Sequence, residues 1–135
     1  MRRLSAAFTM LALLAGPVWA DPPTSDILQT LDQVMIERAT AAKCAAPDSA
    51  KAAAFRRYYQ AVAAEAEMAL KNLASDLDRS HIEKVMLQHY DEIERHVTAI
   101  VAQESCDGSH IKEALQKYDI TANAVIAQQT GKKID

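Results

Sequence analysis

Three side chains in the second half of the chain could together bind a metal ion. His89, Glu92 and His96 are separated by three and four residues, a spacing that places them on one face of an α-helix. Imidazole and carboxylate groups are ligands for zinc, copper or iron. A metal site in a helical bundle usually takes ligands from a second helix, and the chain has no Glu-x-x-His motif of the di-iron type. We therefore keep a helical bundle that binds a metal or a small ligand through these three residues as the alternative function.

Haem chemistry and nucleophilic catalysis have weaker support. Covalent haem attachment requires a Cys-x-x-Cys-His motif, which is absent. Free haem could use Met35, Met68, Met86 or His89 as axial ligands, but methionines at helical spacing usually fill a core. The chain also lacks the Gly-x-Ser-x-Gly motif of a serine hydrolase. We therefore expect no bound cofactor and no enzymatic activity, although folding could still assemble an acid/base pair.

A small cluster of residues has the composition of a protein interface. Arg56, Arg57 and Tyr58 are consecutive, and arginine and tyrosine are enriched where proteins bind one another. An ordinary solvated helix surface is the simpler interpretation of so small a cluster. We keep the three residues as a candidate partner-binding site.

The N-terminus has the three-part pattern of a secretory signal peptide. Arg2 and Arg3 precede an uncharged apolar run, and small residues then lead to Ala20. This pattern predicts a signal peptide over residues 1–20 with cleavage after Ala20, because the run is too short to span a bilayer as a helix. We expect the mature protein, residues 21–135, to be one domain that is periplasmic or secreted. No later segment predicts stable insertion into a membrane.

Charge and cysteine content agree with an exported protein. Removing Arg2 and Arg3 changes the formal net charge from −3 to −5, which argues against nucleic acid as a partner because nucleic-acid-binding surfaces are basic. The two cysteines, Cys44 and Cys106, can form one internal disulfide, and disulfides persist outside the reducing cytoplasm. Free thiols or an intermolecular bridge remain the alternative.

The mature sequence predicts four helices and no strand. It is rich in alanine and other helix-forming residues, and glycine and proline are rare and lie between the apolar stripes. Pro47 ends the first predicted helix, and Asp48 or Ser49 can cap the second. The apolar stripe changes phase near Asp78, so a further helix begins there, with Ser80 and Glu83 as a capping box. The first predicted helix spans about residues 25–44, and the fourth spans about residues 109–129. The second runs from its cap at Asp48 or Ser49 to the break near Asp78, and the third runs from that break to about Cys106.

These helices predict an all-α fold, an antiparallel four-helix bundle with a Cys44–Cys106 disulfide. In such a bundle the first and third helices end at the same pole, where the two cysteines would meet. The expected core consists of the apolar stripes Leu28, Leu31, Met35, Ala39 and Ala42; Phe55, Tyr59, Val62, Ala66, Ala69 and Leu73; Ile82, Met86, Ile93, Val97 and Ile100; and Ile111, Leu115, Tyr118, Ala122 and Val125.

The leading functional prediction is a binding or accessory protein of the cell envelope. Export, small size and a plain helical bundle favour contact with another envelope protein, as in a chaperone-like, inhibitor or immunity protein. The sequence does not identify the partner, and it leaves the oligomeric state open. The alternative is the metal- or small-ligand-binding bundle that uses His89, Glu92 and His96.

Overall fold

The computed structural model describes residues 24–131, which form four α-helices and contain no strand. The helices are α2 (Thr24–Cys44), α3 (Ser49–Leu73), α4 (Arg79–Glu104) and α5 (Ser109–Gln129). The all-α fold class with four helices is confirmed. Most helix boundaries lie within two residues of their predictions, but α3 ends at Leu73, five residues before the break that was predicted near Asp78. No helix in this part of the chain combines the length and apolar character that a membrane span requires. The predicted signal peptide lies outside the described residues.

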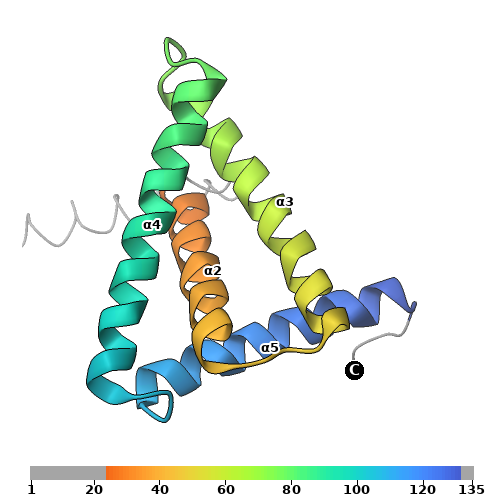
Figure 1. Cartoon of the computed structure of the whole chain (residues 1–135). Coiled ribbons are helices and arrows are strands. Elements are labelled where there is room, and N and C mark those ends of the chain that lie inside the picture. Colours follow the sequence, from red (N-terminus) through yellow and green to blue (C-terminus); the bar gives the residue numbers. More distant parts are fainter. Residues whose placement is uncertain (1–23, 132–135) are drawn as a thin grey trace, which may run out of the picture.

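The four helices pack around α2. Helices α3 and α4 form an antiparallel hairpin that is closed at one end and open at the other, so the pair outlines a triangle (Figure 1). Helix α2 lies between them and contacts α3, α4 and α5. Helix α5 crosses the wide end of the triangle and packs against α2 and α3 (Figure 1). Since α3 and α4 have few direct contacts, α2 supplies most of the surface that holds α4 in place.

The predicted disulfide joins α2 to the end of α4. Cys44 is the last residue of α2, and Cys106 follows α4 by two residues. Their Sγ atoms are bonded, and their Cα atoms lie 5.4 Å apart. The bridge lies at the wide end of the hairpin, where both helices end (Figure 1). It closes a loop over a sequence separation of 62 residues, so it strongly restricts the unfolded chain.

Local residues fix where three of the helices begin, two through a side-chain cap and one through a glycine. Asp48 caps α3 by accepting a hydrogen bond from the backbone N–H of Lys51 at 2.8 Å. Asp78 caps α4 in the same way through the N–H of His81 at 2.8 Å. The predicted capping box does not form, because Ser80 already lies inside α4. Gly108 begins α5 without a side-chain cap. A Cβ atom on this glycine would lie 2.4 Å from the Cβ of Glu104, so the turn requires glycine.

Most residues of the predicted apolar stripes are buried or half-buried, but two residues at the ends of stripes are exposed. The core includes the stacked ring pair of Phe55 and Tyr118, with centroids 4.1 Å apart, which joins α3 to α5. Leu73 was predicted to be buried but is 67% exposed, and Ala42 is also exposed. Leu73 is the last residue of α3, beyond the reach of α5. The buried residues include Leu31, Val34, Met35, Ala39, Ala41, Phe55, Val62, Ala66, Ile82, Ile93, Val97, Ile111, Ala114, Tyr118 and Ala122.

Candidate functional site

The closed end of the α3–α4 hairpin exposes most of the large apolar side chains that the fold leaves in solvent. Five large apolar side chains are exposed in the described part of the chain, and four of them lie between residues 68 and 87. Met68 and Leu73 belong to the end of α3, and Val85 and Leu87 belong to the beginning of α4. We call these four residues the hairpin tip. The fifth, Ile120, lies on α5.

One side of the hairpin tip borders a recess with aromatic walls. Leu87 lines this recess, which has a volume of about 480 Å³, together with Tyr59 and Tyr90. The guanidinium of Arg38 lies 4.6 Å from the ring centroid of Tyr59 and 5.5 Å from that of Tyr90. Because the cation contacts a ring from α3 and a ring from α4, it links both helices to α2. Burial raises the pKa of the Tyr90 phenol above its usual value, while Arg38 opposes this shift.

The other side of the hairpin tip borders a mainly apolar recess of about 390 Å³. Val85 lines it together with Leu28 and Leu70, from α2 and α3. At its polar edge, Nε2 of His89 lies 2.5 Å from Oδ1 of Asp32. This contact joins α4 to α2.

The predicted metal ligands lie on one helix but do not converge. Nδ1 of His89 is 3.9 Å from Oε2 of Glu92, while His96 is exposed two turns further along α4, about 10 Å along the helix axis. Residues 24–131 contain no group of three or more His, Cys, Asp or Glu side chains placed to share a metal ion. The partner of His89 in the structure is Asp32, which the sequence pattern did not indicate. A metal at this trio stays a prediction.

The Arg56–Tyr58 cluster is divided between two environments. Arg56 and Arg57 are exposed on α3, whereas Tyr58 is half-buried. The Tyr58 ring packs at 6.5 Å from that of Phe55 and lines a recess toward α2 and α5. Only the two arginines therefore offer freely accessible groups to a partner. Their predicted role in partner binding stays a prediction.

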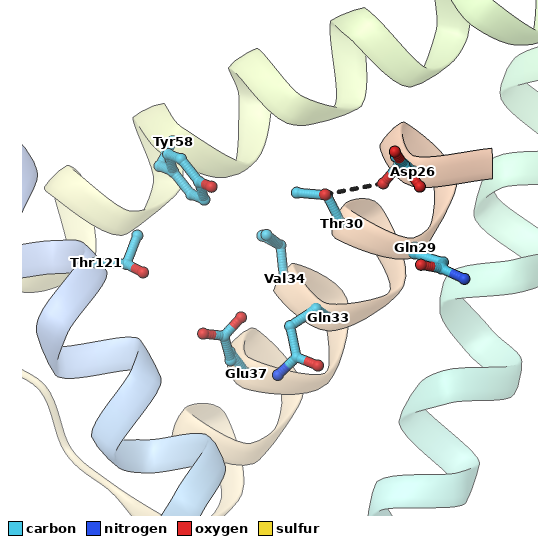
Figure 2. A pocket seen from close by; sticks show the side chains of 8 residues that line it. All are labelled: Asp26, Gln29, Thr30, Gln33, Val34, Glu37, Tyr58 and Thr121. Atoms are coloured by element: carbon cyan, nitrogen blue, oxygen red, sulfur yellow. Dashed lines mark hydrogen bonds between the residues drawn. The ribbon is translucent and has the colours of Figure 1, made fainter. Parts of the chain in front are cut away.

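Sequence reasoning missed Glu37, a carboxylic acid on the buried side of α2. Glu37 is only 4% exposed. It follows the buried Val34 by three residues and precedes the buried Ala41 by four, so its spacing alone places it in the apolar stripe. That spacing was the available signal. Its carboxylate points into an open pocket between α2, α3 and α5, toward the side chains of Tyr58 and Thr121 (Figure 2).

The surroundings of Glu37 favour its neutral form. Burial raises its pKa from the usual 4.5 to about 7, and the positive charge of Lys117 on α5 opposes this shift only in part. Lys117 is itself paired with Glu113, with Nζ 3.0 Å from Oε1. A carboxyl group that titrates near neutral pH inside a pocket is a frequent feature of binding and catalytic sites.

Comparisons with protein-family models, curated protein sequences and solved structures gave no significant match for this chain.

Proposed function

We propose that the protein is an exported accessory protein of the cell envelope that acts by binding another envelope protein through the hairpin tip. The observation that carries this proposal is the concentration of exposed apolar side chains at the closed end of the hairpin. Leu73 and Leu87 are 67% and 66% exposed. Clusters of exposed apolar side chains are typical of sites that bind another protein.

The arrangement of the tip residues favours a partner that surrounds the tip. Val85 and Leu87 are two residues apart on α4, so they face different sides of the helix, and they border different recesses. A flat partner would cover only one of these sides. A partner with a groove would cover both, and it would bury the largest apolar area for so narrow a contact.

The rest of the fold is suited to presenting this tip. The disulfide joins α2 to the end of α4 at the opposite, wide end of the hairpin. The contacts of Arg38 with Tyr59 and Tyr90 link α3 and α4 through α2. Export is supported by the sequence pattern of residues 1–20 and by the disulfide, which persists in oxidising compartments.

A charge placed on the tip tests this proposal. A Leu73→Lys/Leu87→Lys double variant should fold like the wild type, because both residues are exposed, but it should lose its partner. Ile120→Lys is the matched control, since Ile120 is 61% exposed on α5 and lies outside the tip. The measurement is native mass spectrometry of each protein after gentle purification from the cells that produce it.

The expected result is one defined second polypeptide on the wild type and on Ile120→Lys, and none on the tip variant. If the tip variant retains the same polypeptide, the contact is elsewhere and the proposal is wrong. If the wild type carries only a second copy of itself, the tip mediates self-association and the proposed envelope partner is wrong.

A further inference from the structure

We propose that the open pocket between α2, α3 and α5 binds a small organic cation, with the Glu37 carboxylate as its anionic partner. The ligand class is a molecule that carries a protonated amine or a guanidinium group. This site is independent of the proposed protein contact, because no residue of the hairpin tip lines the pocket.

This inference rests on the Glu37 carboxylate, which is almost fully buried by the protein but borders the open pocket. Glu37 is more than nine-tenths buried, yet within residues 24–131 its carboxylate accepts no hydrogen bond and forms no ion pair, and the labelled pocket residues show no bond to it (Figure 2). No buried side-chain oxygen or nitrogen in this part of the chain is both enclosed and without a partner, so the Glu37 carboxylate must open onto the pocket. An unpaired carboxylate in such a place gains most from a cation supplied by a ligand.

The composition of the pocket selects a cation over an anion. It has a volume of about 440 Å³, which lies in the range of small-molecule sites. Two carboxylates, Asp26 and Glu37, line it, and it has no lysine, arginine or histidine in its wall. The remaining lining residues are neutral: Gln29, Thr30, Gln33, Val34, Tyr58 and Thr121.

The neutral lining residues indicate what else the ligand carries. The hydroxyl groups of Tyr58 and Thr121 and the amide of Gln33 can form hydrogen bonds to hydroxyl or amide groups of a ligand. The Tyr58 ring also offers a face to an ammonium or guanidinium group. The Thr30 hydroxyl is already occupied, because it donates to the backbone carbonyl of Asp26 at 2.9 Å. A compact, polar amine therefore fits this wall better than a long apolar one.

A bare metal ion fits the pocket less well than an organic cation. Calcium and magnesium take about six or more oxygen ligands, whereas residues 24–131 bring no three acidic, histidine or cysteine side chains together. An organic cation needs only one carboxylate and can fill the remaining volume with its own atoms.

The same geometry predicts that binding depends on pH. Because the Glu37 pKa is raised to about 7, its charged fraction, and with it the affinity for a cation, should fall about tenfold between pH 8 and pH 6. The other titratable groups in the pocket wall are Asp26 on α2 and Tyr58 on α3, and the charge of Lys117 on α5 also acts on Glu37. Lys117 pairs with Glu113 and forms no ion pair with Glu37.

The test is a titration of the full disulfide-bonded protein followed by NMR. The cationic probes are putrescine and ethanolamine, whose amines are protonated at pH 8. Their uncharged counterparts are 1,4-butanediol for putrescine and ethylene glycol for ethanolamine. At pH 8 we expect at least one cationic probe to shift the amide signals of Glu37, Tyr58 and Thr121 in a saturable way, with a Kd at least tenfold lower than that of its uncharged counterpart.

Two substitutions and one control complete the test. Glu37→Gln should raise the Kd at least tenfold and abolish its pH dependence, and Thr121→Leu should block binding by filling the pocket while leaving Glu37 intact. Glu94→Gln removes a carboxylate that is exposed on α4 and should leave the Kd unchanged. The proposal is wrong if Glu37→Gln binds as tightly as the wild type, if the uncharged counterparts bind equally well, or if no cationic probe saturates these signals.

Discussion

Glu37 makes the stability of the protein depend on pH in a way that one substitution isolates. In the folded protein burial raises its pKa from 4.5 to about 7. The folded state therefore binds this proton more tightly than the unfolded state does. The contribution of Glu37 to stability is fully present below about pH 4.5, is lost as the pH rises toward 7, and stays constant above that.

The size of the effect follows from the shift. One pKa unit corresponds to about 1.4 kcal/mol, so the shift from 4.5 to about 7 would lower the free energy of unfolding by up to about 3 kcal/mol between pH 4 and pH 8. This value is an upper bound, because the carboxylate opens onto a pocket and keeps part of its hydration. Glu37→Gln keeps the shape of the side chain and removes the titration.

The assay is urea unfolding of both proteins at pH 4, 5.5, 7 and 8.5. As the pH rises, we expect the free energy of unfolding of Glu37→Gln to increase relative to that of the wild type. The difference should grow by about 2–3 kcal/mol and level off above pH 7. Glu94→Gln, at an exposed site on α4, should show no such growth. If the wild type and Glu37→Gln give parallel stability curves across this range, the buried and unpaired state of Glu37 is refuted.

Four further variants test the contacts and turns that hold the helices together. Replacing both Cys44 and Cys106 by alanine should lower the free energy of unfolding by about 4 kcal/mol, measured by urea unfolding against the oxidised wild type, and an unchanged midpoint would contradict the role of the bridge. Ser105 has a φ of 63° and a ψ of 176°, a region that favours glycine, so Ser105→Gly should stabilise the fold by about 1 kcal/mol and raise the melting temperature. Gly108→Ala should lower the melting temperature, because the added Cβ would overlap the side chain of Glu104. A shift of either melting temperature in the opposite sense would refute this account of the turn. Arg38→Met should cost about 1–2 kcal/mol by removing the cation from two tyrosine rings, and full stability in a thermal melt would show that the contact does not hold the hairpin.

The helices could be predicted because their signals are local. Pro47, Asp48 and Gly108 act on the few residues around them, so the sequence alone placed the first and last breaks and one of the caps. The end of α3 at Leu73 has no such signal and was predicted too late. The cysteine pairing followed from the order of the helices, since Cys44 and Cys106 end two helices at the same pole. Ser80 was predicted to cap α4, but Asp78 caps it in the structure. Local sequence patterns distinguish poorly between two capping residues that lie so close together.

The remaining features depend on which helices meet and how far each extends. Leu73 belongs to an apolar stripe but is exposed, because α3 extends beyond its partners at the closed end of the hairpin. The crossing of α5 depends on the stacking of Tyr118 on Phe55, a contact between residues far apart in the sequence. Glu37 was missed for a related reason, since a carboxylate in a stripe usually lies at its solvated edge and only the packing of α3 and α5 covers it.

Site-specific photo-cross-linking at the hairpin tip tests the proposed function most directly. A photoreactive amino acid would replace Leu87 in the protein produced by its own cells, and, in a matched control, Ile120, which is similarly exposed on α5. We expect one discrete adduct with an envelope protein from position 87 and none from position 120. The same adduct from both positions, or no adduct from position 87, would contradict the proposal that the tip is the contact surface.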